Sequence, residues 1–552
     1  MIGNGSGHLR YPDAQAALKL QPGDTLFIRP GIYSGLSLGD LSGSAAAPIT
    51  VLCDSNTVFT TRTPPPNEFM NIAHVRFENF RYVGAAADVG AVENQQVSFR
   101  PVASQTDNRK PLFKDFMGLN GHFTFKPELY RQVGRLVRNY HNLNWDVKQP
   151  GDAITVPICV NRVNWKNDVY GRWQKAGYET DLCIQFSGFQ TDAADYQRFW
   201  SGKERWCYDY GKAIAGYFGP SGQEKLCTSI EIGNEPGSKF DRALFKSIFK
   251  QMASGIREGD PRVKILTPAV QARQGDDYSQ DLCGLYAEKD ILPLYDVINL
   301  HTYAAVARKN SSESPWNRSY PEDPALVYLK VVDEAIAWRD ANAPGKEIWI
   351  TEFGYDACTP EAMKRRRDWF LKLDWQGVTD LQQAQYLVRS FFAFAGRDIQ
   401  RAYIYYYDDN DSPSVHGCAG LTRKFVPKQS FWAVKQLYEL LGNYRFKRVV
   451  KTVPREICVH EFESGDDANH VIWAAWSPTG VRTNEKDLYV PREKKATLDG
   501  LPILPIRVFG MATAEGDAPQ PFWEKAGPAT ITVTIGESPV YIVMETAKRS
   551  GQ

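Results

Sequence analysis

Apolar residues in the middle of the chain follow two patterns that alternate. Short apolar runs of strand length, such as 228–236 and 346–355, precede longer stretches whose apolar residues recur at helical spacing, such as 240–258. Eight of these strand-then-helix units fit into residues 111–440, at about 40 residues per unit. Such regular alternation predicts an α/β fold, a parallel (β/α)8 TIM barrel.

The weakest of the expected strands overlaps an expected helix. Residues 127–140 have a helical pattern, yet 136–145 is needed as the second strand of the barrel. A helical stretch is also expected near 280–290. A doubly wound open sheet is the alternative architecture, although the sequence lacks the glycine-rich phosphate-binding turn typical of that fold.

The two ends of the chain have a different pattern, in which apolar and polar residues alternate without helical stretches. Residues 1–100 contain short β-like runs separated by turns, and the pieces 22–35 and 73–84 resemble rungs of a right-handed parallel β-helix. They could equally be strands that pack on another β domain. Residues 444–549, with strand-like runs such as 486–491, predict a C-terminal β-sandwich.

Charge and composition exclude some partners. The 552-residue chain has 65 basic and 64 acidic residues, and this balance argues against nucleic-acid binding. It contains no run of about 18 apolar residues, so no membrane span is predicted. Aromatic residues make up 12% of the chain, which fits either large β-rich cores or rings that line a carbohydrate cleft. Residues 1–12 show no signal peptide, yet we expect a periplasmic or secreted protein.

The nine cysteines, an odd number, are expected to be mostly free thiols. No Cys or His cluster has the spacing of metal ligands, so we expect neither a metal nor a cofactor. Five cysteines lie in apolar, strand-like runs, as small buried residues do: Cys53, Cys159, Cys183, Cys227 and Cys458.

Polar residues follow many of the expected barrel strands. In a (β/α)8 barrel, functional side chains lie at the carboxyl ends of the strands. Asn234 and Glu235 end the fourth strand, and Glu352 ends the seventh. Their joint pattern, rather than any single residue, indicates a site at the mouth of the barrel. Other strand ends supply polar or aromatic candidates: Asn120, His122, Arg138, His301, Tyr303, Tyr405 and Tyr407.

The two glutamates indicate a specific chemistry. Glu235 and Glu352 lie 117 residues apart, close to three repeats, so we expect them on opposite sides of the barrel mouth. Glycoside hydrolysis needs such a facing pair, one carboxyl group to protonate the leaving oxygen and one to attack or stabilise the anomeric carbon. A separation of about 5–5.5 Å predicts retention of configuration, and about 6.5–9.5 Å predicts inversion.

The stretches IGNEP (232–236) and WITEFGY (349–355) resemble the clan A glycoside hydrolases, which are (β/α)8 enzymes that retain configuration. The resemblance implies that Glu235 is the acid/base and Glu352 the nucleophile. It also implies that Asn234 binds the sugar 2-hydroxyl. The layout, with a C-terminal β-sandwich, is similar to that of the xylosidase and iduronidase-like members.

Other residues match the clan A pattern in part. NLHTY (299–303) implies that Tyr303 orients the nucleophile and that His301 lines the site, and Arg138 matches an arginine near the nucleophile. Many members end strand 8 in a Trp that forms a non-prolyl cis peptide under the sugar, whereas this chain has tyrosines, among them Tyr405 and Tyr407. The resemblance implies a retaining glycosidase that cleaves β-type O-glycosidic bonds in an oligo- or polysaccharide.

The two glutamates are expected to differ in protonation. Arg138 and Tyr303 would stabilise the Glu352 anion and lower its pKa, whereas burial and the charge of Glu352 would raise the pKa of Glu235. A pair of this kind predicts a bell-shaped pH profile on the acidic side of neutrality.

Several alternatives stay open. A barrel that binds carbohydrate without catalysis, or a polysaccharide lyase acting through the N-terminal β segment, would also bind sugar polymers. Asp408, Asp409 and Asp411 fit either a cation site or, more readily, an exposed acidic loop. Glu231 is expected to face the helices, because alternation places it opposite its apolar neighbours.

Overall fold

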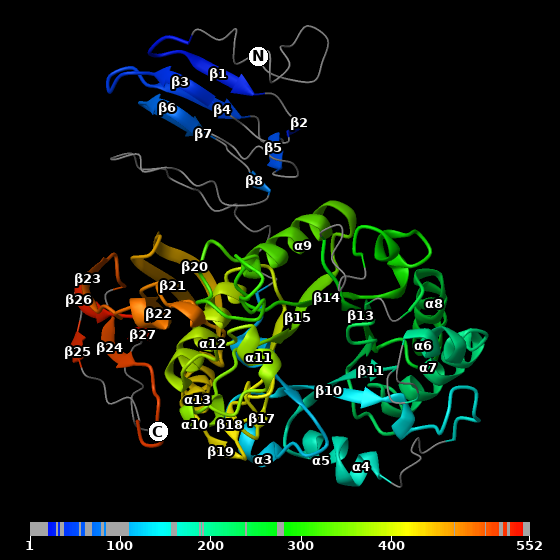
Figure 1. Cartoon of the computed structure of the whole chain (residues 1–552). Coiled ribbons are helices and arrows are strands. Elements are labelled where there is room, and N and C mark those ends of the chain that lie inside the picture. The colour runs from blue at the N-terminus through cyan, green and yellow to red at the C-terminus, as the bar shows by residue number, and fades with distance from the viewer. Residues whose placement is uncertain are drawn as a thin grey trace, which may run out of the picture. The chain divides into compact units, whose positions relative to one another are not determined.

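A computed structural model describes residues 20–544 with gaps. The chain forms two compact units, Met1–Gln105 and Thr106–Gln552, and each is described by itself (Figure 1). The predicted boundaries at 100, 111, 440 and 444 stay predictions. The gaps are at 29–30, 34–37, 54–56, 61–68, 79–81, 84–109, 156–162, 187–188, 190–192, 238–239, 273–280, 468–469, 503, 518–522 and 527–529.

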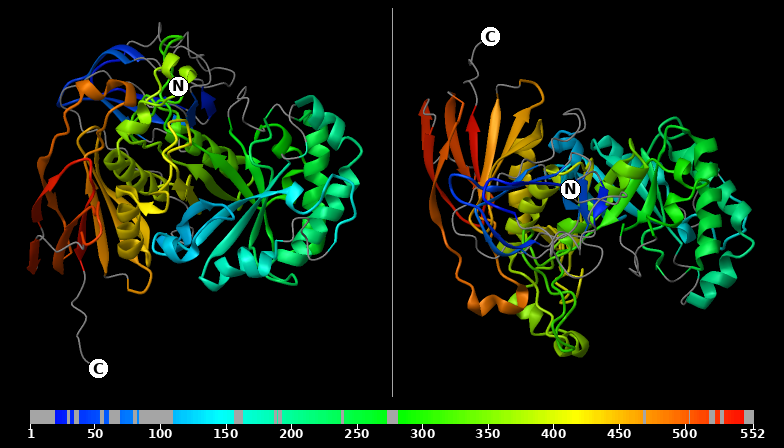
Figure 2. Two further views of the ribbon diagram at one scale, coloured as in Figure 1. Left: turned by 60° about the horizontal axis from the view of Figure 1, so that its bottom comes forward. Right: turned by 90° about the horizontal axis from the view of Figure 1, so that it is seen from above.

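Eight parallel strands close into a barrel in the second unit (Figures 1 and 2). Each strand pairs with the next in chain order, and the last closes on the first. The predicted (β/α)8-type barrel is therefore confirmed, and the open sheet is excluded. The strands are β9 (Met117–Gly121), β10 (Leu136–Asn142), β11 (Glu179–Gln185), β12 (Ser229–Ile232), β13 (Lys264–Ala269), β14 (Val297–His301), β15 (Glu347–Phe353) and β16 (Arg401–Ile404).

Helices connect these strands, and in the described part of the chain none is both long and apolar enough to cross a membrane. The longer ones are α6 (Ala193–Trp200), α7 (Glu204–Phe218), α8 (Arg242–Gly259), α9 (Tyr328–Asn342), α12 (Asp380–Ala395) and α13 (Gln429–Leu441). The shorter ones are α2 (Phe113–Phe116), α3 (Pro127–Tyr130), η2 (Leu143–Trp145), α4 (Trp165–Asp168), α5 (Tyr170–Lys175), η4 (Leu285–Ala287), η5 (Leu292–Leu294), α10 (Pro360–Met363) and α11 (Asp368–Lys372).

Local sequence explains where two of the long helices begin. The Asp241 side chain accepts hydrogen bonds from the backbone N–H groups of Ala243 and Leu244 and so caps α8. Thr379 and Gln382 form a reciprocal capping box at the start of α12.

Two helical predictions were wrong in extent. The predicted helix at 127–140 ends after α3, because 136–142 form β10, whose parallel pairing to both β9 and β11 outweighs the local helical pattern. Near 280–290 only η4 is helical among the residues described.

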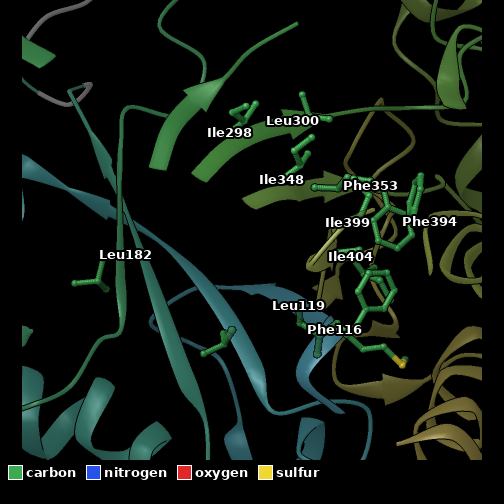
Figure 3. Close-up of a cluster of buried hydrophobic side chains, with 14 of the residues drawn as sticks. Phe116, Leu119, Leu182, Ile298, Leu300, Ile348, Phe353, Phe394, Ile399 and Ile404 are labelled. Atoms are coloured by element: carbon green, nitrogen blue, oxygen red, sulfur yellow. The ribbon is translucent and has the colours of Figure 1, made fainter. Parts of the chain in front are cut away.

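The outward faces of the barrel strands carry apolar side chains that pack under the helices. Figure 3 shows part of this layer. In it, Phe353 of β15 contacts Phe394 of α12, with ring centroids 5.1 Å apart. Both rings are fully buried. Burial of this layer fastens the helices to the barrel. Its labelled members include Leu119, Leu182, Ile298, Leu300, Ile348 and Ile404.

Glu231 lies inside the barrel, so the prediction that it faces the helices was wrong. Its carboxylate accepts two hydrogen bonds from Arg138 of β10, two strands away in the barrel, at 2.7 and 2.8 Å. The alternation along β12 was correctly inferred, but the inward and outward faces were interchanged. Ile230 and Ile232 face outward and pack in the apolar layer under the helices, a layer in which the charge of Glu231 would be unfavourable.

The C-terminal region forms two antiparallel sheets that share one apolar core. Residues 486–491, predicted as a strand, instead overlap the 3-10 turn η6 (Thr483–Leu488). The larger sheet has the order β20-β21-β22-β27-β24-β25, and the smaller pairs β23 with β26. Their bounds are β20 (Tyr444–Val453), β21 (Ile457–Ser464), β22 (Val471–Trp476), β23 (Lys494–Asp499), β24 (Pro505–Gly510), β25 (Trp523–Ala526), β26 (Thr530–Ile535) and β27 (Val540–Met544).

The larger sheet also packs against helix α12 of the barrel. The Phe392 ring lies 5.5 Å from that of Phe462 and 5.2 Å from that of Trp476. Beside these rings, Glu322 accepts hydrogen bonds from Arg389 of α12 at 3.0 Å and from the Trp476 indole at 2.6 Å. The sheet is therefore joined to the barrel by both apolar and charged contacts.

The N-terminal unit consists of short parallel pairs. Strand β1 pairs with β4, and β4 pairs with β7, so that Thr25 lies opposite Thr50 and Thr50 lies opposite Arg76. The β-helix itself stays a prediction. The strands are β1 (Thr25–Ile28), β2 (Gly31–Tyr33), β3 (Leu38–Ser42), β4 (Ile49–Cys53), β5 (Thr57–Thr60), β6 (Phe69–Ala73), β7 (Val75–Glu78) and β8 (Tyr82–Val83), paired as β1-β4-β7, β2-β5-β8 and β3-β6.

Replacing Phe394 by Ala should destabilise the barrel strongly. The substitution removes a fully buried ring from the layer between α12 and β15, so we expect a loss of about 3–5 kcal/mol in the free energy of unfolding. Phe123→Ala is the matched control, because Phe123 is 55% exposed. Urea denaturation measures both; equal losses would contradict the packing role of Phe394.

Candidate active site

A pocket of about 400 Å³ opens at the carboxyl ends of the barrel strands. Both predicted glutamates contribute to its wall. The lining residues are His122, Tyr140, Asn142, Gln185, Asn234, Glu235, Tyr303, Glu352, Tyr405, Tyr406 and His416.

Glu235 reaches the pocket because the chain turns sharply after β12. Gly233 has φ 91°, a left-handed conformation that favours glycine. Its N–H donates to the Ile184 carbonyl of β11 at 3.0 Å, so the turn remains tied to the barrel. The Glu235 side chain is 33% exposed.

Glu352 reaches the pocket through an irregularity near the end of β15. This strand shifts register against both β14 and β16. As a result, the consecutive residues Thr351 and Glu352 both face the interior: Thr351 Oγ1 contacts His301, and Glu352 contacts Arg138. A bulge of this kind re-aims a side chain that strict alternation would turn outward.

The Glu352 carboxylate accepts three hydrogen bonds. Oε1 accepts from the Tyr140 hydroxyl at 2.6 Å and from Arg138 Nη1 at 3.1 Å, and Oε2 accepts from the Tyr303 hydroxyl at 2.8 Å. Burial alone would raise its pKa, but the charges of His301 and Arg138 and the two phenol hydrogen bonds outweigh burial and lower the pKa to about 2. Glu352 is therefore an anion at any ordinary pH.

Arg138 is fully buried and joins four strands beneath the pocket. Besides Glu231 and Glu352, it donates to Asn120 Oδ1 at 2.8 Å and to Asn234 Oδ1 at 2.7 Å. These four acceptors fix the position of the guanidinium, because its planar donors match acceptors in few geometries.

His301 bridges the two glutamates. Its Nδ1 lies 2.7 Å from Glu235 Oε1 and 3.6 Å from Glu352 Oε2. One oxygen of each carboxyl group and the His301 nitrogen all lie within 4.8 Å of one another. These three atoms could act as ligands of one metal ion, but both oxygens of Glu352 already accept hydrogen bonds from tyrosines. The charges of both glutamates outweigh burial and raise the pKa of His301.

The other predicted residues divide into three groups. His122 and Tyr405 line the pocket, and the Tyr405–Tyr406 peptide bond is cis. Asn120 lies below the pocket, where it accepts from Arg138 and donates to the Thr351 carbonyl at 2.8 Å. Tyr407 does not reach the pocket, contrary to expectation.

Tyr407 instead lies in the apolar core. Its ring contacts those of Phe125 and Tyr130, each 5.5 Å away, and its hydroxyl bonds to Thr124. The neighbouring Tyr406 lines the pocket in its place. The register of side chains after the end of β16 is set by tertiary packing rather than by alternation.

Several pocket residues were not predicted. Tyr140 and Asn142 lie two and four residues after Arg138 on the same face of β10, so alternation from Arg138 could have identified them. Gln185 ends β11 in the same way. His416 comes from a loop, and no local pattern indicates it.

The aspartates after strand 8 form neither a cation site nor an exposed loop. Asp409 is buried and lies 3.2 Å from Lys428 Nζ. Asp411 accepts from the Thr359 backbone at 3.0 Å and lies 3.3 Å from Arg423. Both ion pairs lie within the segment after β16, which contains β17 (Asp408–Asp409), β18 (Thr422–Arg423) and β19 (Val426–Pro427), and the Thr359 hydrogen bond ties this segment to the loop after β15.

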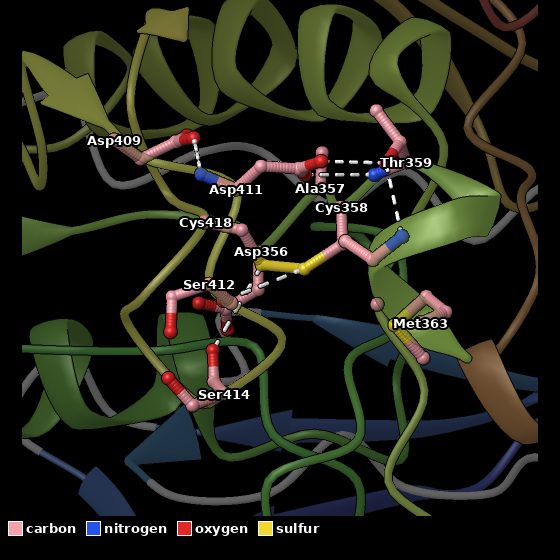
Figure 4. Close-up of a disulfide and its surroundings, with 12 residues drawn as sticks. Asp356, Ala357, Cys358, Thr359, Met363, Asp409, Asp411, Ser412, Ser414 and Cys418 are labelled. Carbon is pink, nitrogen blue, oxygen red and sulfur yellow. Dashed lines mark hydrogen bonds between the residues drawn. A yellow bond between two sulfur atoms is a disulfide. The ribbon is translucent and has the colours of Figure 1, made fainter. Parts of the chain in front are cut away.

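Cys358 and Cys418 form a disulfide that was not predicted (Figure 4). It joins the loops after β15 and β16, 60 residues apart in sequence. The other described cysteines are free thiols, as expected. Of the five predicted buried thiols, Cys53, Cys183, Cys227 and Cys458 are buried, and Cys159 lies outside the described residues.

No protein-family model matches this sequence, and no curated protein matches it either. Solved structures do match the fold. A family 39 glycoside hydrolase from the gut symbiont Bacteroides cellulosilyticus aligns with a TM-score of 0.55 at 14% identity, over 80% of this chain and 82% of that one.

Two further structures align at a similar level. A glucosidase from Croceicoccus marinus has a TM-score of 0.52 at 12% identity, over 79% of this chain and 97% of that one. A bifunctional glucanase-xylanase from a metagenome library has a TM-score of 0.51 at 12% identity, over 80% and 98%. The chain thus has the fold of these (β/α)8 glycoside hydrolases, as its motifs predicted.

Proposed function

We propose that this protein is a retaining glycoside hydrolase that cleaves β-type O-glycosidic bonds of an oligo- or polysaccharide. The observation that carries the proposal is the spacing of the glutamates: an oxygen of Glu235 lies within 4.8 Å of an oxygen of Glu352. Retaining enzymes hold their carboxyl groups about 5–5.5 Å apart, whereas inverting enzymes need about 6.5–9.5 Å to admit a water.

In the first step, Glu352 attacks the anomeric carbon. Its low pKa keeps it ionised, and Tyr140 and Tyr303 fix both oxygens. Glu235 gives a proton to the leaving oxygen as the glycosidic bond breaks, and a glycosyl ester of Glu352 forms. Asn234 Oδ1 is held by Arg138, so its amide nitrogen is the end that donates to the sugar 2-hydroxyl.

His301 shares the proton that Glu235 transfers to the leaving group. The Thr351 hydroxyl donates to Asn299 Oδ1 at 2.5 Å, so His301 Nε2 must be the donor in its 3.0 Å contact with Thr351 Oγ1. The single proton between Nδ1 and Glu235 Oε1 is then shared by the pair. Whichever atom holds it, the pair delivers one proton to the leaving group.

In the second step, the ester has removed the negative charge of Glu352. Glu235, now a carboxylate, takes a proton from a water that attacks the anomeric carbon. The product leaves with the configuration of the substrate, and Glu352 is again an anion. Atoms and charges balance over the two displacements.

A lyase or a non-catalytic sugar-binding protein predicts different products. A lyase yields an unsaturated ring that absorbs ultraviolet light, and a binding protein yields no product. Neither alternative explains why an anion held by Arg138 and two phenols faces a second, proton-sharing carboxyl group.

Glu235→Gln and Glu352→Gln should each abolish most turnover of 4-nitrophenyl β-glycosides. Removing the general acid should lower kcat by about 10²–10⁴-fold, and removing the nucleophile by at least as much. Azide should restore turnover to Glu235→Ala, because it attacks the glycosyl ester without a general base. Glu128→Gln, at a side chain that is 72% exposed, is the matched control. Wild-type rates in either active-site variant would refute the assignment.

Tyr140→Phe and Tyr303→Phe should each move the acid limb of the kcat/KM profile to higher pH. Each phenol stabilises the Glu352 anion, so its loss raises the pKa of Glu352 from about 2 towards the ordinary value of 4.5, by about one pH unit per hydroxyl. Tyr406→Phe, in the same pocket, should leave the limb in place. An unmoved limb in both test variants would exclude Glu352 as its source.

The sugar freed when a β-glycoside is hydrolysed should first appear as the β anomer. Proton NMR recorded within minutes of mixing, before mutarotation, distinguishes the anomeric signals. Accumulation of the α anomer from a β-glycoside would show inversion and contradict the double displacement inferred from the close glutamates.

A further inference from the structure

His416 is one of the pocket residues that have no part in the mechanism above. His416 lies in the loop after β17 and lines the pocket beside Tyr303 and Tyr405. Its backbone has φ 64°, a left-handed conformation that is uncommon for a residue with a side chain. Uncommon backbone conformations persist where the surroundings enforce them, and they concentrate at functional sites.

The surroundings that enforce this conformation come from the loop after β15. The His416 N–H donates to Asp356 Oδ1 at 2.6 Å. Two residues further along, Cys418 is bonded to Cys358, and the Cys418 carbonyl accepts from the Ala357 N–H at 2.9 Å. Figure 4 shows the two loops joined at these residues. The backbone of His416 is thus held directly by one hydrogen bond, and two residues further along by a disulfide and a second hydrogen bond.

The ring of His416 is packed edge-to-face on two aromatic rings of the pocket. Its centroid lies 4.6 Å from that of Tyr303 and 5.3 Å from that of Tyr405. No hydrogen bond to either ring nitrogen is found among the residues described. Burial lowers the pKa of His416, so the neutral ring offers one N–H donor and one nitrogen acceptor.

The position of a second, smaller pocket indicates which part of a substrate His416 would meet. That pocket adjoins Glu235 on the side of Phe186, Tyr196 and Phe240, and Asn234 also lines it. Because Glu235 protonates the leaving oxygen, the leaving group lies towards this side. His416 belongs only to the main pocket, on the side of Glu352 and Tyr303.

We infer that His416 is a specificity-determining residue that hydrogen-bonds a ring hydroxyl of the sugar bound at Glu352, and that the Cys358–Cys418 disulfide holds it in place. The inference rests on the proposed function and deepens it. It predicts a contact with the sugar that is cleaved off, not with the leaving group. A hydroxyl can both give a hydrogen to the imidazole and accept one from it, so this contact suits a carbohydrate.

The test compares wild type with His416→Gly. Glycine adopts φ 64° without strain, so this variant removes the ring while leaving the backbone conformation favourable. With the 4-nitrophenyl β-glycoside that wild type hydrolyses best, we expect kcat/KM to fall about 3–10-fold, the worth of one neutral hydrogen bond. The melting temperature should be unchanged or higher. His416→Asn, which also tolerates this φ, should recover part of the loss.

Monodeoxy versions of that glycoside separate a sugar contact from a packing role. The penalty of His416→Gly should disappear for the one deoxy sugar that lacks the contacted hydroxyl, and persist for the others. It should also be the same for good and poor leaving groups. An equal penalty for every deoxy sugar would show that His416 only supports Tyr303 and Tyr405, and would overturn the inference.

Reduction tests the role of the disulfide. Dithiothreitol, or the Cys358→Ser/Cys418→Ser double variant, should lower kcat/KM in the wild-type background but have little further effect in His416→Gly, because both changes act through the same ring. Equal losses in the two backgrounds would refute the link.

The outcome for wild type distinguishes this inference from the proposed function. If Glu352→Gln abolishes turnover but His416→Gly equals wild type, only the inference on His416 fails. If wild type hydrolyses no glycoside, binding of gluco- and xylo-configured iminosugars is compared by thermal shift. Weaker binding by His416→Gly then supports the contact, and absence of binding by wild type overturns both proposals.

Discussion

The charge of Arg138 is the constraint on which the centre of this barrel depends. A guanidinium with no exposure to water costs several kcal/mol, about the effective penalty of one buried ion, unless anions and acceptors surround it. Glu231 pairs with it below, Glu352 above, and Asn120 and Asn234 at its sides. These acceptors come from β9, β12, β15 and the turn after β12, so satisfying one cation fixes the relative positions of the strands that form the pocket floor.

Arg138 also separates the apolar bottom of the barrel from the polar pocket above it. Below Arg138 the barrel is closed by apolar side chains, among them Leu136, Leu266 and Trp349. Above it, the surplus of donors around Glu352 keeps that carboxylate ionised despite its burial. Glu235 lies further out, partly exposed and hydrogen-bonded to His301 rather than to Arg138. Two identical side chains thus have different surroundings, because only Glu352 contacts the buried cation.

The loops above the barrel are held by interactions of another kind. Ion pairs of Asp409 with Lys428 and of Asp411 with Arg423 brace the segment after β16, and the Cys358–Cys418 disulfide and the Thr359–Asp411 hydrogen bond join it to the loop after β15. Loops lack the regular hydrogen bonds of a sheet, so side chains must supply the restraint. The segment after β16 thereby presents the His416 imidazole and two tyrosines, Tyr405 and Tyr406, to the pocket.

The sequence by itself determined the barrel and the places of Glu235 and Glu352 at strand ends, because alternation, strand length and strand-end position are local properties. It also predicted that Arg138 and Tyr303 lie near Glu352. It could not decide which face of β12 turns inward, so Glu231 was assigned to the wrong side; that choice is made only when the barrel closes around Arg138. Tyr407 packs in the core, and His416 lies in a loop that a disulfide joins to a cysteine 60 residues away in sequence. Both positions were likewise decided by tertiary contacts that no local pattern encodes.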